Sequence, residues 1–307
     1  MSDSKHYNDY GTWIRSMFPF RVQKISINAG FSCPNRDGRI GQGGCIYCDN
    51  RTFNPSYCNS TSSIKAQLEE GKKFFSHKYP DMKFLAYFQA YTNTYESIDK
   101  LKCMYEEALS VEDVIGIVIG TRPDCVSDEL LDYLGHLNTQ TFITIEYGIE
   151  TANNNTLKLI NRGHDFECVK RIVSKTAEKG IITGGHIILG LPGEDSEEII
   201  RQAPLISALP INILKLHQLQ VIHGTKLEQM YKEHPFHLFS PDEYIELIGR
   251  YIKLLRKDIV IERFTSQSPK DMLVGPQWGM KNHEFTDKLM KYLRENNIYQ
   301  GQNVILP

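Results

Sequence analysis

Short apolar runs alternate with longer amphipathic segments along most of the chain. Several short runs, such as VIGIVIG and HIILG, are apolar at nearly every position, which is typical of strands covered on both faces of a parallel sheet. In the longer segments, apolar residues recur with a helical period. The alternation predicts six strand–helix units. The expected strands span 24–28, 83–88, 113–119, 141–146, 182–189 and 212–219, and the expected helices span 62–79, 96–109, 127–137, 165–179, 194–208 and 226–233.

The pattern changes after the sixth unit. Ser240 offers an N-cap, Pro241 suits the first helical turn and Glu243 completes a capping box, so a strong helix is expected to begin here. A further strand at 259–263 and a terminal helix near 284–296 complete a C-terminal α/β extension. Because no internal repeat or Gly/Ser-rich linker sets this part off, we expect it to pack on the preceding units.

Together these elements predict an α/β fold, a partial (β/α)6 barrel of the TIM type followed by the extension. We expect residues 1–225 to form the barrel with an N-terminal lead-in, and residues 226–307 to form the extension. An α/β barrel fills a chain of 307 residues as one unit. Two similar halves are therefore not expected.

The overall charge is close to neutral, with 35 basic and 37 acidic residues and a net charge of −2. No global basic field indicates a nucleic-acid or acidic-lipid partner, although a local basic face is allowed. The N-terminus lacks the apolar region of a signal peptide, and the apolar run at 115–119 is far too short to cross a bilayer. We expect a cytoplasmic protein with no membrane association.

Seven cysteines, an odd number without a secretion signal, favour metal binding or catalysis over a disulfide framework. Cys33, Cys45 and Cys48 are spaced C-x11-C-x2-C in the glycine-rich loop after the first strand. Loops at this end of barrel strands carry active sites, and three soft thiolates suit iron–sulfur or zinc. In a four-iron cluster, three ligands would leave one iron open to a small molecule.

One other interpretation of these three cysteines stays open at this point. A structural zinc site would need a fourth ligand, such as Cys58 or a histidine, although no second pair with recognisable spacing is present. The remaining Cys103, Cys125 and Cys168 are expected to be small buried hydrophobic residues.

The run Cys45-Ile46-Tyr47-Cys48 resembles the end of the three-cysteine motif of the radical SAM superfamily. The long first gap, with CPNRDG before GGCIYC, is similar to that of the YhcC-like group, which is related to the catalytic subunit of the elongator complex. The resemblance covers about residues 20–280. It implies that Cys33, Cys45 and Cys48 hold a [4Fe–4S] cluster, that S-adenosylmethionine (SAM) binds the open iron, and that Tyr47 packs near adenine.

The same resemblance implies a set of SAM contacts after the second strand. Gln89, Tyr91 and Thr92 occupy the place where the superfamily carries the turn that holds the methionine amino group. After the third strand, GTRPD is similar to the TRPD of the elongator class, with Gly120 in place of the preceding acid.

Three further stretches are similar to the elongator class. EYGIET and NRGH imply that Glu150 contacts the SAM ribose and that Arg162 holds the SAM carboxylate, a task that suits the planar guanidinium. The turn containing Gly190, Leu191 and Pro192 is expected beside adenine. In the sixth strand and the residues that follow it, His217 and His223 are expected either to face the substrate or to be structural.

The implied activity is reductive cleavage of SAM to a 5′-deoxyadenosyl radical, with electrons from a donor such as flavodoxin or ferredoxin. The elongator class suggests tRNA as substrate, at the wobble uridine. Because too few residues follow the sixth strand for that class's acetyltransferase domain, the chemistry should differ from acetyl-CoA-dependent carboxymethylation. The alternatives are a radical SAM enzyme for a small metabolite or peptide, and a non-catalytic zinc or iron–sulfur protein.

Overall fold

The computed structural model describes residues 5–52, 54–76 and 81–304. Its centre is a seven-stranded sheet in which every neighbouring pair of strands is parallel. The strands are ordered along the sheet as they are along the chain. They are β1 (Val22–Ile27), β2 (Lys83–Phe88), β3 (Val114–Thr121), β4 (Phe142–Glu150), β5 (Ile182–Leu189), β6 (Ile213–Gln218) and β8 (Val260–Arg263).

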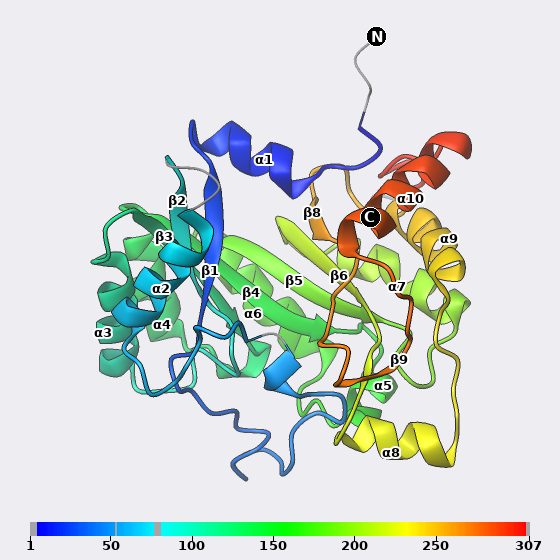
Figure 1. Ribbon diagram of the computed structural model, residues 1–307, viewed down its shortest axis with the longest axis horizontal. Helices are drawn as coiled ribbons and strands as arrows, with labels where there is room; N and C mark the ends of the chain where they lie inside the picture. The colour runs from blue at the N-terminus through cyan, green and yellow to red at the C-terminus, as the bar shows by residue number, and fades with distance from the viewer. Residues whose placement is uncertain (1–4, 53, 77–80, 305–307) are drawn as a thin grey trace.

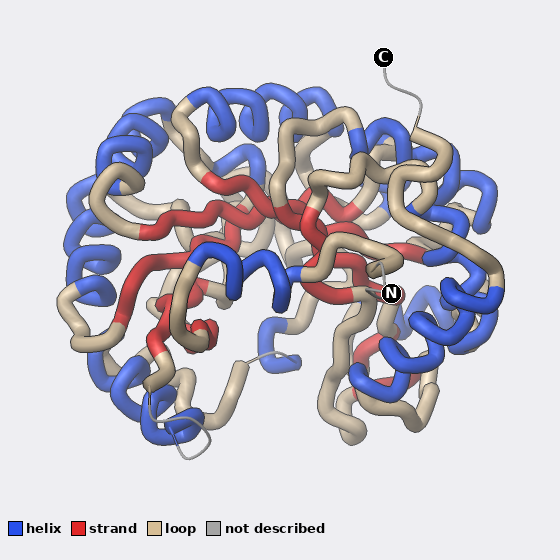
Figure 2. The backbone as a smooth tube through the Cα atoms, turned by 90° about the horizontal axis from the view of Figure 1, so that it is seen from above, coloured by secondary structure: helices blue, strands red, loops and turns tan. Residues whose placement is uncertain are grey.

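Helices cover the outer face of this sheet, and Figure 2 shows the strands as a curved layer inside an arc of helices. The sheet is therefore an open barrel, and the predicted fold class is confirmed. Each predicted helix is present within a few residues of its expected bounds, except that the end expected for the first, at 77–79, lies outside the described residues. The helices are α2 (Ile64–Ser76), α3 (Ile98–Leu109), α4 (Asp128–Leu137), α6 (Phe166–Glu178), α7 (Ser196–Ser207), α8 (Lys226–Glu233), α9 (Pro241–Ile252) and α10 (Asn282–Glu295).

The sheet contains one strand more than the six units predicted. The strand expected at 259–263 is β8, which pairs in parallel with β6 and so extends the barrel sheet from within the predicted extension. Helix α9 is the crossover between β6 and β8, and α10 packs on α9. The N-cap Ser240 and Glu243 form the expected capping box at the start of α9.

Besides the 3-10 helices η1 (Asn50–Thr52) and η2 (Pro123–Cys125), four short elements of the described residues were not predicted. They are α1 (Tyr10–Met17), α5 (Asn154–Leu159) and the antiparallel pair β7 (Val221–Ile222) with β9 (Leu273–Gly275). Each is too short, or buries too few side chains, to show a period in the sequence. Figure 1 shows α1 across the end of the barrel where the strands begin, and the loop after β1 at the opposite end.

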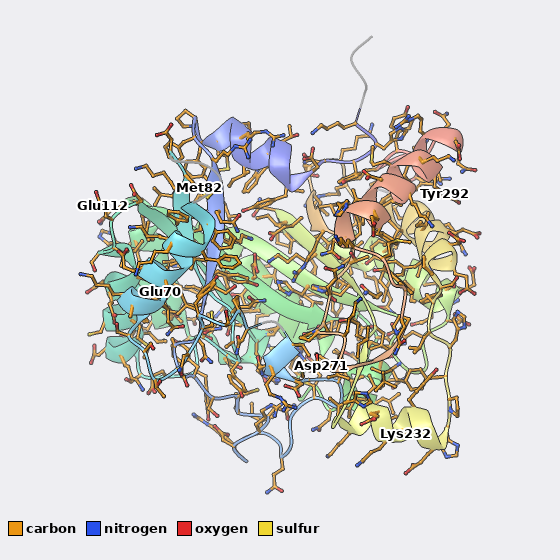
Figure 3. All side chains as sticks on the ribbon, viewed as in Figure 1. Glu70, Met82, Glu112, Lys232, Asp271 and Tyr292 are labelled. Carbon is orange, nitrogen blue, oxygen red and sulfur yellow. The ribbon has the colours of Figure 1, made fainter. Side chains whose placement is uncertain are left out.

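The two faces of the sheet differ in chemistry. On β4, the side chains of Ile143, Ile145 and Tyr147 belong to the large apolar core, which is shared with the helices. Figure 3 shows the side chains of the described residues on the ribbon. The alternate residues point into the barrel. They include Glu146, whose side chain is 0% exposed. The interior of the barrel is therefore partly polar, and it leads to the site described next.

No helix within the described ranges is long and apolar enough to cross a membrane.

Candidate functional site

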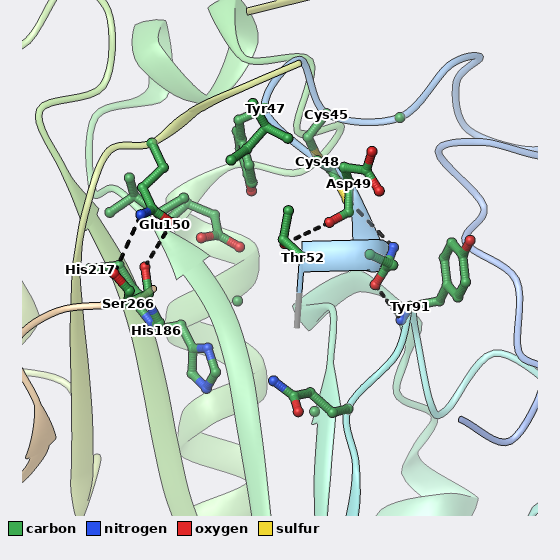
Figure 4. A pocket seen from close by; sticks show the side chains of 18 of the residues that line it. Cys45, Tyr47, Cys48, Asp49, Thr52, Tyr91, Glu150, His186, His217 and Ser266 are labelled. Atoms are coloured by element: carbon green, nitrogen blue, oxygen red, sulfur yellow. Dashed lines mark hydrogen bonds between the residues drawn. The ribbon is translucent and has the colours of Figure 1, made fainter. Parts of the chain in front are cut away.

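A single cavity of about 290 Å³ opens at the end of the barrel where the strands finish. Cys33, Cys45 and Cys48 line it from the loop after β1. Its other walls come from the ends of β2, β3, β4, β5, β6 and β8, and Figure 4 shows the labelled residues converging on it. The cysteine loop and the strand ends thus form one site, as their places in the sequence predict.

The cysteine loop has little regular structure, and it is fastened to the segment between β4 and α6. The Ile46 amide donates to the carbonyl of Ile160 (3.1 Å), and the Asn161 side chain donates to the carbonyl of Gly44 (2.9 Å). The Leu227 amide of α8 donates to the carbonyl of Ile46 (3.0 Å). These long-range bonds fix the loop against two elements distant in sequence, so the positions of the thiols depend on the folded barrel.

Nitrogen donors surround the sulfur atoms. Asn35 Nδ2 and Arg162 Nη1 each lie 3.6 Å from Cys45 Sγ, and Asn50 Nδ2 lies 3.7 Å from Cys48 Sγ. Burial, together with the nearby Cys45 thiol, raises the pKa of Cys48 to about 11. Hydrogen bonds to sulfur are one way in which proteins tune iron–sulfur clusters.

This donor set fits an iron–sulfur cluster. Three thiolates that line one cavity are soft ligands, and a four-iron cluster takes each of them on a separate iron. Cys58, the possible fourth zinc ligand, directs its thiol to the carbonyl of Ser26 (2.9 Å).

Glu150 and Arg162 meet at the end of β4. Arg162 Nη2 donates to the carbonyl of Gly148 (2.6 Å) and lies 3.4 Å from Glu150 Oε1. Glu150 sits at a register shift between β4 and β5 and has a φ of 68°, an uncommon value for a residue with a side chain. This strained backbone turns the Glu150 carboxylate toward Arg162, and both residues line the cavity.

Gly148 makes this arrangement possible. A Cβ at this position would lie 2.5 Å from Glu150 Oε1 and 2.6 Å from Arg162 Nη2. We expect Gly148→Ala to displace both side chains and to weaken SAM binding by at least about 10-fold, because a charge-assisted contact is worth that much. Equilibrium dialysis with the reconstituted protein measures it. Gly135→Ala, on the outer helix α4, is the matched control, and equal affinities of the two variants would contradict the assignment.

The turn after β2 brings Gln89, Tyr91 and Thr92 to the same cavity. The Tyr91 amide donates to Asn50 Oδ1 (3.0 Å), and the Thr92 amide donates to the carbonyl of Ser32 (3.3 Å). The turn is thus tied to the cysteine loop. Tyr47 also lines the cavity. The individual SAM contacts of these residues stay predictions.

Gly190, Leu191 and Pro192 are not brought to this cavity. They line a second hollow, between the β5–α7 turn and the residues around α9, together with Phe239 and Arg250. Gly190 has a φ of 93°, and a Cβ there would lie 3.0 Å from the Phe239 ring. Their expected place beside adenine stays a prediction without support from the cavity lining.

Arg122, in the stretch similar to TRPD, supports the site from the position directly after β3. Its guanidinium donates to both carboxylate oxygens of Asp124 (2.9 and 2.7 Å) and to the carbonyl of Arg162 (2.7 Å). The ion pair with Asp124 therefore holds the Arg122 guanidinium in place. Arg122 in turn fixes the position of the Arg162 backbone.

Sequence reasoning missed the charged wall inside the barrel. Glu146 accepts from Lys24 (2.9 Å) and Lys215 (2.6 Å), and lies 3.0 Å from His186 Nε2. Burial alone would raise the pKa of Glu146, but Lys215 and Lys24 hold it well below its ordinary value. Glu146 and Lys215 interrupt otherwise apolar strands at inward-facing positions. A charged residue inside an apolar run could therefore have indicated this wall from the sequence.

His217 and His223, which were expected to be structural or to face the substrate, differ in position. His217 lines the cavity and stacks on His186 with ring centroids 5.4 Å apart. His223 is exposed, and its Nδ1 lies 2.9 Å from Glu228 Oε1. Only the first of the two is placed to meet a ligand in this cavity.

A pH dependence follows from His217. Burial, the positive charge of Arg263 and the neighbouring His186 and Lys215 lower its pKa well below the ordinary value, so it is neutral when folded. The contribution of neutral His217 to the free energy of unfolding is complete above about pH 6.5, the ordinary pKa of histidine. This contribution is lost as the pH falls below that value. Between about pH 7.5 and 5.5 we expect His217 to contribute a loss of up to about 1.4 kcal/mol in the free energy of unfolding.

Urea unfolding of the apoprotein at both pH values measures this loss, and His217→Asn should remove it. An identical pH dependence in the variant and the wild type would show that His217 does not titrate on unfolding.

Comparison with known proteins agrees with this geometry. Residues 33–202, more than half of the chain, match the model of the radical SAM superfamily, and residues 211–295 match the Radical_SAM C-terminal domain. YtqA of Bacillus subtilis is 34% identical over 97% of this chain and 92% of its own length. YhcC of Escherichia coli is 31% identical over 97% of this chain and 96% of its own length.

More distant similarity connects the chain to elongator-type proteins. A tRNA uridine(34) acetyltransferase of Methanocaldococcus infernus is 24% identical over 63% of this chain and 36% of its own length. The solved structure of the Methanocaldococcus infernus Elp3, at 18% identity, shares the fold with a TM-score of 0.67 over 92% of this chain and 64% of that one. The chain thus belongs to the radical SAM superfamily of [4Fe–4S]- and SAM-dependent enzymes, in a YhcC-like group related to elongator proteins.

Proposed function

We propose that this radical SAM enzyme modifies tRNA at the wobble uridine. One observation carries the proposal, namely that the three thiols and a polar wall of Glu146, His186 and His217 share a single cavity. A cofactor at the thiols and a substrate group at the polar wall would then be held together without solvent between them. The relative named as a tRNA uridine(34) acetyltransferase supports tRNA as the substrate.

The residues of this chain would have different roles, according to their places in the cavity. Cys33, Cys45 and Cys48 would hold the [4Fe–4S] cluster, and Arg162 and Glu150 would orient SAM beside it. When bound and reduced, these cofactors supply a 5′-deoxyadenosyl radical, which can take a hydrogen atom from a substrate carbon. The protein contributes orientation and a closed surrounding, because the cofactors carry the difficult chemistry.

An external reductant is part of the proposal. We propose flavodoxin or ferredoxin as donor, in the cytoplasm, where thiols stay reduced. The cysteine loop presents the exposed Arg39 at the surface, and Arg36 of the same loop donates to the carbonyl of Cys48 (2.5 Å). An exposed arginine on the loop that carries the thiols would suit contact with an acidic electron carrier.

The test uses reconstituted enzyme, SAM, dithionite and tRNA from cells that lack this protein. We expect the tRNA to increase 5′-deoxyadenosine formation and to bind with an affinity that falls as salt rises. The same tRNA from cells that contain the protein, already modified, is the matched control. No salt-dependent binding and no stimulation by either tRNA would contradict the proposal and would favour a small metabolite or peptide as substrate.

A further inference from the structure

A charged cluster inside the barrel, next to the cavity, has an unbalanced charge. It contains three cationic side chains, Lys24, Lys215 and Arg263, and two carboxylates, Glu146 and Glu262; of these, Glu146 and Arg263 line the cavity. Lys24 lies 2.9 Å from Glu146 and 2.6 Å from Glu262, and Lys215 lies 2.6 Å and 3.2 Å from the same two carboxylates. Each of the four carboxylate oxygens is thus paired with a lysine ammonium group. Because three cations face only two carboxylates, one positive charge stays in excess.

That excess charge belongs to Arg263, at the end of β8. No hydrogen bond or ion pair of its guanidinium occurs among the residues that the structure describes, and its Nε is buried without a partner. Nearby, Nε2 of His217 is also buried without a partner. Buried polar atoms of this kind are costly unless something satisfies them. The two residues lie on neighbouring strands, where Arg263 of β8 pairs in register with Lys215 of β6, two residues before His217.

Arg263 and His217 line the same cavity as the cysteines. Figure 4 shows His217, His186 and Ser266 on the left of the cavity, with Cys45 and Cys48 at the upper right and Glu150 between them. A ligand that satisfied Arg263 would therefore extend toward the space next to the cluster loop. This is the position expected of a substrate, and not of SAM, whose predicted partners Glu150 and Arg162 lie closer to the thiols.

We propose that Arg263, with His217 as a second donor, binds a carboxylate group carried by the substrate. The inference rests on the proposed function in taking that substrate to enter the cavity from tRNA. A carboxylate carries one negative charge and so balances the single excess positive charge, whereas a phosphate monoester would carry nearly two; a backbone phosphodiester also carries one, and the salt dependence measured below separates it from a carboxylate. The planar guanidinium pairs with a carboxylate through two parallel hydrogen bonds.

The first test measures the site without tRNA. The probe is trifluoroacetate, followed by 19F line broadening, with SAM-loaded holoenzyme so that the SAM carboxylate occupies its own site. We expect broadening that acetate reverses and acetamide does not, and that Arg263→Gln abolishes. Inorganic phosphate at the same concentration should compete less well than acetate. Equal broadening in wild type and Arg263→Gln, or stronger competition by phosphate, would overturn the carboxylate site.

The second test uses tRNA and separates this inference from the proposed function. If wild-type enzyme acts on tRNA, Arg263→Gln should lower kcat/KM by about 10- to 100-fold, the value of a charge-assisted pair. Arg263→Lys should keep more of it, and Lys253→Gln, at the half-buried C-cap of α9, should keep all of it. The salt dependence of tRNA affinity should stay unchanged in Arg263→Gln.

A salt slope reduced by about one would show that Arg263 contacts a backbone phosphate, and would overturn the inference. Unchanged kcat/KM would do the same. If wild-type enzyme ignores tRNA but trifluoroacetate binds through Arg263, the proposed function fails while the carboxylate site stands. Iron content and urea unfolding of Arg263→Gln exclude a folding defect as the cause of any loss.

Discussion

Replacing Cys45 by serine is expected to abolish cluster binding and SAM cleavage while the barrel stays folded. Cys45 is buried between the side chains of Asn35 and Arg162, and its loop is fastened by backbone bonds that do not involve the thiol. Serine keeps nearly the same shape but is not a soft thiolate ligand. After anaerobic reconstitution, iron should fall from about four per chain to below about one, and 5′-deoxyadenosine formation should fall to background.

Cys103→Ser, at an exposed position on α3, is the matched control and should retain both iron and activity. Far-UV circular dichroism and urea unfolding of the apoproteins report on folding. If Cys45→Ser keeps its iron, the cysteine assignment is wrong. If it loses iron only because the apoprotein no longer folds, the thiol is structural, and the interpretation as a non-catalytic metal-binding protein gains support.

The largest effect on stability is expected for Glu146→Gln. Glu146 is fully buried and is shared by Lys24 of β1, Lys215 of β6 and His186 of β5. Removing its charge leaves two ammonium groups against one carboxylate in the barrel interior, a change that costs about 3–5 kcal/mol in the free energy of unfolding. Chemical denaturation of the apoprotein measures the loss.

The control is Glu197→Gln, which breaks the exposed pair with Arg250 (2.6 Å) and should cost less than about 1 kcal/mol. The double variant Glu146→Leu with Lys215→Met should recover part of the loss, because an apolar pair replaces an ion pair at little cost. A loss for Glu146→Gln no greater than that of the control would mean that the network does not stabilise the barrel.

This network also explains how the open sheet keeps its shape. Lys24 and Glu262 stand on β1 and β8, the two edges of the sheet, and their 2.6 Å ion pair spans the barrel interior between them. Both side chains also reach toward Lys215 or Glu146 in the middle. We infer that buried charge performs, across the gap between the edge strands, the role that ladder hydrogen bonds perform in a closed barrel.

Much of the site could be predicted because parallel strands end at one edge. The loop containing Cys45, the turn after β2 and the end of β4 are remote in sequence, yet each follows a strand, so all three reach one cavity. Motif resemblance then assigned Glu150 and Arg162, whose proximity the structure shows. The local sequence pattern was sufficient to place these residues in the site because each lies at the end of a strand of the sheet or in the segment that follows it.

Other features depend on long-range packing that no local pattern contains. The pairing of Lys24 with Glu146 joins residues 122 positions apart, and it depends on the curvature of the sheet. The turn at Gly190 packs against Phe239, next to α9, and this contact directs it to the second hollow. The placement of β8 beside β6 likewise depends on how α9 crosses the sheet. Each of these contacts depends on packing between elements that are distant in the sequence.

The most direct test is a comparison of modified nucleosides in tRNA from cells with and without this protein, by mass spectrometry. If the protein modifies tRNA at the wobble uridine, one wobble uridine derivative should disappear without it and a precursor should accumulate. Wild-type protein should restore the pattern, whereas the Cys45→Ser variant should not. Identical nucleoside profiles in the presence and absence of the protein would contradict this function.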